Sequence, residues 1–325
     1  TFCGQSLVVQ WATLKCSLRK ACKSKPVDLK LDLNNPKTFT RLFGLPMSAL
    51  LYFLGVFPLA LEVYVSLTDW YPIGGQQYFW DSRFIGLGNF VEYFQDPLFG
   101  GSILRTVIVV VVAISLEFVF GLILALLFMD RFRGKTIFTS IVLLPMMTVP
   151  AVTGYIFRML FLYAGPVNDA LSAIAGTRVS VGWLTSAWPA LTSVILMDVW
   201  QWTPLMFLIL LSGLLALPQD PINAAYVLGA SKWQAFRHLM LPMMKPIILV
   251  GLVIRTMDAI KIFDGVFLMT HGGPGYSTQT LSLFLYEIGF KYMRLGYTAA
   301  MALTVLVCLA LFTRYVAIKP LKPKV

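Results

Sequence analysis

Four charged residues stand at steps of three inside one long apolar run: Arg255, Asp258, Lys261 and Asp264. Charges in a segment that crosses a bilayer are costly, so each of them is a candidate for a functional role. On one helix, neighbours three residues apart lie close together, and the four would then form a ladder of internal ion pairs. The residues leave both interpretations open, an internal salt-bridge ladder and contact with a solute.

Other chemistry finds little support in the sequence. The chain has only two histidines, His238 and His271, and neither falls near its cysteines, so we expect no zinc site. The other apolar runs hold isolated charged residues, namely Glu62, Glu117, Arg158 and Asp198. They form no paired acid–base set of the kind that a catalytic centre requires. We therefore expect no enzyme activity, metal or cofactor in this chain, and keep a polytopic membrane enzyme using intramembrane Asp and Arg as an alternative.

The composition indicates that lipid surrounds most of the chain. Of the 325 residues, 58% are hydrophobic and only 13% are charged, whereas a soluble domain carries roughly a quarter charged residues. A helix needs about 20 apolar residues to cross the hydrocarbon core. Six continuous stretches qualify, at about 42–67, 103–129, 137–162, 188–213, 246–270 and 297–318. We predict an all-α polytopic membrane protein with six transmembrane helices, which together form a transmembrane domain over residues 42–318.

Basic residues indicate how these helices are oriented. Of the 26 Lys and Arg residues, 18 fall in the tail 1–41, in the loops 130–136 and 214–245, or in the C-terminal end from Arg314, which includes a tail at 319–325. Because cytoplasmic loops carry the excess of basic residues, both termini are predicted to be cytoplasmic. This distribution explains the formal charge of +11 as an orientation signal and a contact with anionic membrane lipids. A nucleic-acid partner is not expected.

The loop at 217–245 shows signals for two short helices. Asp220 followed by Pro221 is a typical helix start, with Asp as the N-cap. Gly229 supplies a residue that accepts a positive φ, as a helix C-terminus often requires. Ser231 and Gln234 then have the spacing of a capping box, which begins the second helix.

The second of these helices carries an apolar face with nothing obvious in the sequence to bury it. Trp233, Phe236 and Met240 form this face, and Pro242 is expected to end the helix. Two interpretations remain open. The pair of helices either lies on lipid headgroups or fits a groove on a soluble partner.

The same loop resembles the EAA loop of binding-protein-dependent importer permeases. The resemblance rests on Asn223-Ala224-Ala225, Gly229-Ala230-Ser231, Phe236 and Leu241-Pro242. The stretch from Arg255 to Thr280, which contains a Gly-Gly-Pro element, and the segment Phe84–Phe90 are similar to the carbohydrate branch of that family, which includes the maltose importer. The resemblance covers about residues 42–318. In such permeases this loop contacts the ATPase, which implies a coupling role here for Asn223, Ala224, Ala225, Gly229, Ala230, Ser231, Trp233 and Phe236.

The resemblance implies a set of partners and a mechanism. Two ATPase subunits, which bind ATP and Mg²⁺, move the loop and drive alternating access. A second homologous permease subunit and an extracytoplasmic solute-binding protein complete the transporter, in a bacterial inner membrane. The chain departs from the family at Asn223, where Glu is usual, and at Leu228, where Asp is common. The lost charge implies a contact that depends more on packing.

By position in the family, the substrate path is expected to include Asp198, Gln201, Trp202, Arg255 and Asp258. A Trp ring offers a flat apolar face to a pyranose, and Gln and Asp offer partners for hydroxyl groups. Arg255 would also suit the carboxylate of an acidic oligosaccharide, such as one that an alginate importer takes up. The resemblance thus predicts a permease for a carbohydrate, most simply an oligosaccharide, with a permease for a non-sugar solute as the alternative.

Overall fold

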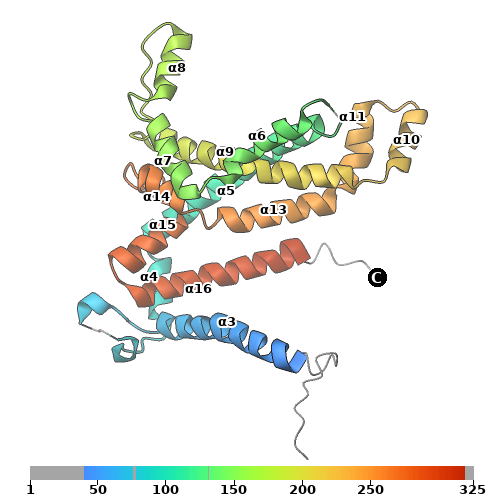
Figure 1. Ribbon diagram of the computed structural model, residues 1–325. Helices are drawn as coiled ribbons and strands as arrows, with labels where there is room; N and C mark the ends of the chain where they lie inside the picture. Colours follow the sequence, from blue (N-terminus) through green and yellow to red (C-terminus); the bar gives the residue numbers. More distant parts are fainter. Residues whose placement is uncertain (1–39, 76–77, 131, 319–325) are drawn as a thin grey trace, which may run out of the picture. The chain divides into compact units, whose positions relative to one another are not determined.

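The computed structural model describes residues 40–75, 78–130 and 132–318 (Figure 1). Within this part of the chain the regular structure is helical, apart from one isolated antiparallel bridge between Thr68 and Phe84. The predicted tail at 319–325, and that at 1–41 except for its last two residues, lie outside the described residues. The chain divides into two compact units, and the boundary between them falls between Ala60 and Leu61, inside one helix.

The first unit contains a π-helical turn at Thr40–Gly44 and most of helix α3 (Leu45–Ser66). The second contains all the other described helices: α4 (Gly88–Phe94), α5 (Pro97–Leu127), α6 (Lys135–Met147), α7 (Pro150–Leu160), α8 (Pro166–Ala175), α9 (Ala187–Leu215), α10 (Gln219–Val227), α11 (Lys232–Ala235), α12 (Leu241–Met243), α13 (Lys245–Ala259), α14 (Asp264–Thr270), α15 (Leu281–Tyr286) and α16 (Leu295–Phe312). Short 3₁₀ and π turns complete it, at Pro72–Gly74, Phe79–Asp81, Phe236–Met240, Glu287–Lys291 and Thr313–Ile318.

Four of these helices are long and apolar enough to cross a membrane: α3, α5, α9 and α16 extended to Tyr315. Two bent helix pairs raise the number of candidate spans in the described residues to as many as six. The helical polytopic architecture predicted from the apolar runs is therefore present. α5 begins six residues before the predicted span at 103, because the Asp96 carboxylate accepts a hydrogen bond of 2.8 Å from Leu98 N and Pro97 occupies the first turn.

The apolar run predicted as one span at 137–162 is bent into two helices in the structure. α6 and α7 meet at 94°. Thr148 and Val149 between them are extended, with ψ of 144° and 131°. Val149 precedes Pro150, and a residue before proline is sterically driven out of the α region. The bend was thus encoded in the sequence by a proline inside the apolar run.

The apolar run predicted as one span at 246–270 is also interrupted. α13 ends at Ala259, and α14 begins only at Asp264. Backbone groups released by a break at membrane depth must find partners within the protein. The Ile262 carbonyl accepts a hydrogen bond of 3.1 Å from Thr280 Oγ1, and the Ile260 carbonyl accepts one of 3.3 Å from Ser282 Oγ. The hydroxyl groups of Thr280 and Ser282, at the start of α15, therefore stabilise the break. No Pro or Gly lies between Ala259 and Asp264 to predict it from the sequence.

Glycine residues let two pairs of helices approach closely. A Cβ on Gly121 of α5 would lie 3.0 Å from the Phe207 backbone nitrogen of α9. A Cβ on Gly154 of α7 would lie 2.6 Å from the carbonyl oxygen of Gly265 in α14. Small residues at helix crossings of this kind are typical of membrane proteins. The close crossing of α7 and α14 holds α14 in its place after the break.

Replacing Gly154 by Ala should destabilise the protein, because the added methyl group meets backbone and not a flexible side chain. Overpacking of this kind costs about 1–3 kcal/mol. The midpoint of thermal unfolding of the purified transporter measures the effect. Gly100→Ala in α5 is the matched control, since its Cβ would meet nothing within 4 Å. Equal midpoints for the two variants would contradict the close crossing of α7 and α14.

Candidate functional site

A buried arginine joins three helices next to the break in the fifth predicted span. Arg255 of α13 is 1% exposed. Its guanidinium donates two hydrogen bonds to Glu117 of α5, with Nε–Oε2 at 2.7 Å and Nη2–Oε1 at 2.9 Å. The Nη2 group also donates to Asp198 of α9. A planar guanidinium suits this bidentate geometry, and a buried charge requires such partners.

The four charges at steps of three form only part of the ion-pair ladder that their spacing suggested. Asp258 lies 3.5 Å from Arg255 Nη1 and 3.8 Å from Lys261 Nζ. Asp264 lies beyond the break and forms no ion pair with any described residue. The closest partners of Arg255 lie instead on other helices. The spacing of charges along one segment could not predict that Glu117 binds Arg255. In the sequence, Glu117 stood out only as a single acidic residue in an apolar run.

A cavity of about 150 Å³ lies beside this ion cluster, at the break between α13 and α14. All five residues predicted for a substrate path line this cavity, together with eight others. The full wall consists of Pro150, Met197, Asp198, Gln201, Trp202, Arg255, Asp258, Ala259, Lys261, Ile262, Phe263, Asp264 and Gly265. The break therefore turns polar groups of α13 and the N-terminus of α14 towards one space.

The five predicted residues differ in how accessible they are. Asp198 and Gln201 are buried, and Gln201 Nε2 donates a 3.0 Å hydrogen bond to the Thr148 carbonyl at the bend between α6 and α7. Trp202 is partly exposed, and its ring centroid lies 5.1 Å from the guanidinium carbon of Arg255. The side chain of Asp258 is 44% exposed and that of Lys261 is 65% exposed. Trp202 of α9, Asp258 of α13 and Lys261 in the break thus form the accessible part of the wall.

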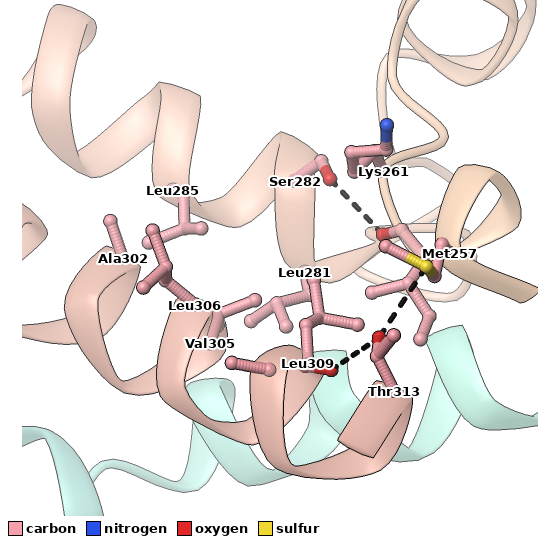
Figure 2. A pocket seen from close by; sticks show the side chains of 12 residues that line it. Met257, Lys261, Leu281, Ser282, Leu285, Ala302, Val305, Leu306, Leu309 and Thr313 are labelled. Atoms are coloured by element: carbon pink, nitrogen blue, oxygen red, sulfur yellow. Dashed lines mark hydrogen bonds between the residues drawn. The ribbon is translucent and has the colours of Figure 1, made fainter. Parts of the chain in front are cut away.

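Another cavity is larger but chemically plainer (Figure 2). It measures about 420 Å³ and lies among the ends of α13, α15 and α16. Its polar groups are largely engaged, since Thr313 Oγ1 contacts Met257 Sδ at 3.4 Å and Ser282 Oγ reaches the Ile260 carbonyl (Figure 2). Apolar side chains form most of its wall. Groups able to orient a polar ligand converge at the smaller cavity.

The first helix of the 217–245 loop begins earlier than its sequence signals suggested. Pro218 occupies the N-cap position of α10, so the prediction that Asp220 is the N-cap is wrong and Asp220 lies in the first turn. Pro218 is extended, with ψ of 130°, and the helix starts at the residue after it. The other end is as predicted. Gly229 has φ of 87°, and Ala230 N donates to the Ala225 carbonyl at 2.9 Å.

The second helix of the loop starts as predicted but does not end at Pro242. Both hydrogen bonds of the Ser231–Gln234 capping box are present. Residues 236–240 then form a π-helical turn, in which Leu241 N–H donates to the Phe236 carbonyl five residues earlier. This wider turn avoids the close approach to the carbonyl four residues back through which proline breaks an α-helix. Pro242 therefore lies inside α12, and the prediction that it ends the helix is wrong.

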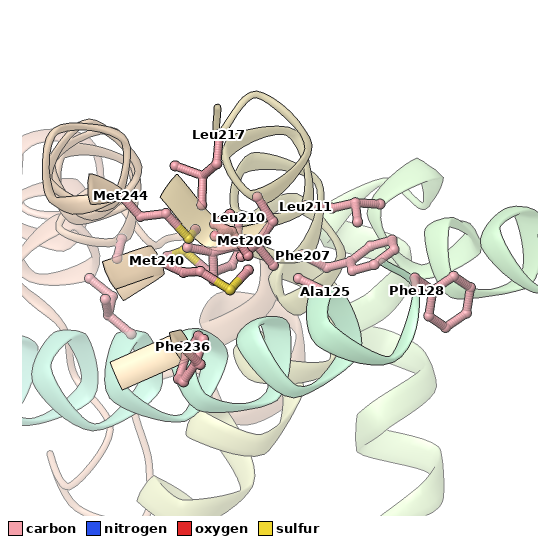
Figure 3. Close-up of a cluster of buried hydrophobic side chains, with 14 of the residues drawn as sticks. Ala125, Phe128, Met206, Phe207, Leu210, Leu211, Leu217, Phe236, Met240 and Met244 are labelled. Atoms are coloured by element: carbon pink, nitrogen blue, oxygen red, sulfur yellow. The ribbon is translucent and has the colours of Figure 1, made fainter. Parts of the chain in front are cut away.

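The loop has a buried face and an exposed face. Phe236 and Met240 pack into a core cluster with Phe128 after α5 and with Phe207 and Leu210 of α9 (Figure 3). The apolar face predicted from sequence is therefore divided, with Phe236 and Met240 inside the protein and Trp233 outside.

Several of the residues predicted for coupling lie on the exposed face, namely Asn223, Ala224, Gly229, Ser231 and Trp233, whereas Ala225 and Ala230 are half-buried. Two apolar neighbours at the end of α10 are even more exposed, Val227 at 87% and Leu228 at 88%. The core cluster connects this exposed tip to α5 and α9, which also carry Glu117 and Asp198 of the ion cluster. Of these two helices, α9 also lines the cavity, through Asp198, Gln201 and Trp202.

Comparisons with known proteins agree with this architecture. The family model described as binding-protein-dependent transport system inner membrane component matches residues 117–319. The chain is 38% identical over 260 residues to the probable ABC transporter permease protein y4oQ of Sinorhizobium fredii, covering 80% of this chain and 82% of that one. It is 34% identical over 216 residues to the trehalose/maltose transport system permease protein MalF of Thermococcus litoralis, with coverage of 66% and 72%.

A solved structure shares the fold. The bacterial ABC transporter involved in the import of the acidic polysaccharide alginate has a chain that superposes with a TM-score of 0.74 at 20% sequence identity, covering 90% of this chain and 98% of that one. The family match extends over the ion cluster, the cavity wall and the 217–245 loop. This chain belongs to the family of inner membrane components of binding-protein-dependent transport systems.

Proposed function

We propose that this chain is a permease subunit of an ATP-binding-cassette importer and that it translocates a carbohydrate, most simply an oligosaccharide. The observation that carries the proposal is the cavity at the α13–α14 break, where Trp202 stands beside Asp258 and Lys261. The name of the trehalose/maltose permease at 34% identity supports the same solute class. Neither a non-sugar solute nor an enzymatic role has comparable support.

In this proposal, the accessible wall of the cavity contacts the sugar. The Trp202 ring covers the apolar face of a pyranose, and the Asp258 carboxylate and Lys261 ammonium bind its hydroxyl groups. Asp198 and Gln201 are buried in the wall and support its accessible residues without direct contact with the sugar. Arg255 acts as a positioning residue, because its guanidinium is occupied by carboxylates of this chain and lies against Trp202.

The exposed tip of the 217–245 loop receives the driving force. Two ATPase subunits bind ATP and Mg²⁺ and close on the tip at Asn223, Val227, Leu228 and Trp233, while this chain itself hydrolyses nothing. With Asn223 in place of an acidic residue, the contact rests mainly on these exposed apolar side chains. The core cluster around Phe236 passes the movement to α5 and α9.

Further partners complete the importer. A second homologous permease subunit supplies the other wall of the path, and an extracytoplasmic binding protein delivers the solute. Both termini and the 217–245 loop face the cytoplasm, with the basic residues of the tails beside anionic lipids. A structure of the alginate transporter is described as a complex with a periplasmic protein that holds an alginate pentasaccharide, which supports this kind of delivery.

Replacing Trp202 by Ala should raise the KM for uptake of a disaccharide by about tenfold, because the stacking surface for the sugar is lost. Initial rates in proteoliposomes that contain the complete transporter measure the effect. Trp188→Ala is the matched control, because Trp188 lies on the same helix and is 73% exposed outside the cavity. An unchanged KM for Trp202→Ala would remove the sugar contact from the proposal.

A further inference from the structure

We infer that the cavity selects an uncharged carbohydrate and disfavours one that carries a carboxylate or sulfonate. This inference rests on the proposed function and adds the charge of the substrate to it. It concerns the wall at the α13–α14 break, where Arg255 and Lys261 are the cationic residues among those that line the cavity. Recognition of an anionic sugar requires at least one cation that is free to bind it.

Arg255 does not offer that cation. Its Nε and Nη2 groups bind both oxygens of Glu117, Nη2 also binds Asp198, and Nη1 lies 3.5 Å from Asp258. The side chain is 1% exposed. A substrate carboxylate would have to displace a buried carboxylate of the protein, which would then remain buried without a partner. The hypothesis that Arg255 binds a uronate is therefore replaced by a role within the cluster.

Lys261 is accessible but already has a carboxylate beside it. Its Nζ lies 3.8 Å from Asp258 Oδ1, and Asp258 in turn faces Arg255. Asp264 adds an exposed carboxylate to the same wall and has no cationic partner among the described residues. Carboxylates thus exceed cations on the accessible wall. Hydroxyl groups of a neutral sugar find acceptors at Asp258 and Asp264, whereas an anionic group meets like charge.

The similar proteins include transporters for uncharged sugars and for an acidic one, and the charge of this wall distinguishes between these two substrate classes. Trehalose and maltose, which are named for the permease at 34% identity, are uncharged disaccharides. Alginate, named for the transporter that shares the fold at 20% identity, is acidic. A shared fold does not fix the charge of a cavity, because single side chains on its wall decide it. The side chains of this chain favour the uncharged class.

A matched series of disaccharides tests the inference. The complete transporter in proteoliposomes is given one disaccharide in three forms, which carry at C6 a hydroxyl, a carboxylate or an ammonium group. The neutral and cationic forms should inhibit uptake of the labelled neutral sugar at least about tenfold better than the carboxylate form. Equal or better inhibition by the carboxylate form would overturn the inference and leave the proposed function intact. Absence of uptake for every form, with ATP hydrolysis present, would overturn the proposed function as well.

Two variants connect the preference to the named residues. Asp258→Asn leaves Lys261 without its carboxylate, and Asp264→Asn removes the unpaired acid, so the pair of changes should raise the carboxylate-to-neutral ratio of inhibition by about tenfold. The ratio is the readout because either change also affects the binding of neutral sugar. Asp169→Asn on α8, outside the cavity, is the control and should leave the ratio unchanged. A ratio that stays constant in the double variant would show that these carboxylates do not set the charge preference.

Discussion

Replacing Arg255 by Met should destabilise the transporter more than any other single change on the cavity wall. The variant leaves the Glu117 and Asp198 carboxylates buried close together with no cation between them. Breaking a buried ion cluster by removing one partner costs about 3–5 kcal/mol, a large part of the stability of a typical protein. We expect little assembled transporter in the membrane and a strongly lowered midpoint of thermal unfolding, measured on the purified complex.

Control variants separate this effect from the loss of a positive charge alone. Lys261→Met removes an ammonium group that is 65% exposed and should leave the midpoint within about 0.5 kcal/mol of the parent. Arg255→Lys keeps the charge but cannot bind Glu117 with two parallel hydrogen bonds, so we expect an intermediate midpoint. Combining Arg255→Met with Glu117→Met and Asp198→Leu should restore much of the stability. A parent-like midpoint for Arg255→Met alone would contradict the role of the cluster.

Replacing Gly229 by Val should abolish uptake while the ATPase subunits remain active. Gly229 has φ of 87°, a conformation that costs an L-residue roughly 1–2 kcal/mol and a β-branched one more. A Cβ there would meet nothing within 4 Å, so the effect comes from the backbone and not from a clash. The bend between α10 and α11 would shift, and with it the tip that we propose receives the ATPase. Uptake and ATP hydrolysis are measured in the same proteoliposomes.

The best control for this variant is a glycine in the same conformation elsewhere. Gly176 follows α8 with φ of 66°, and a Cβ at this position would also meet nothing within 4 Å, so Gly176→Val carries similar strain away from the loop. Its uptake should remain near that of the parent protein. Gly229→Asn should keep most of the uptake, since Asn tolerates a positive φ. Full uptake in Gly229→Val would remove the mechanical role of the bend.

The sequence was sufficient where the signal was local or periodic. Long apolar runs predicted the ends of α3, α5, α9 and α16 to within six residues, because a bilayer demands continuous apolar helices. The positive φ of Gly229 and the Ser231–Gln234 capping box followed from the chemistry of helix ends. The bend at Pro150 was visible in the sequence as well and was missed only because the hydropathy of the run outweighed the proline.

Features that depend on contacts between distant segments were not predictable in this way. The break after Ala259 is stabilised by Thr280 and Ser282, which lie some twenty residues further along the chain. Glu117 binds Arg255 across 138 residues, and no spacing rule connects the two. The five residues predicted for the substrate path could be named from the sequence only because the family resemblance indicated their positions. Their division into buried and accessible groups required the structure.

In the proposed mechanism, ATP drives a sugar across the membrane through this subunit. The most direct test is the accumulation of a labelled neutral disaccharide in proteoliposomes that contain the complete transporter and its binding protein, with ATP present only on the side of the 217–245 loop. We predict accumulation against a gradient that depends on ATP and is lost in Gly229→Val. Equal uptake with and without ATP, or ATP hydrolysis with no movement of sugar in the parent transporter, would contradict this mechanism.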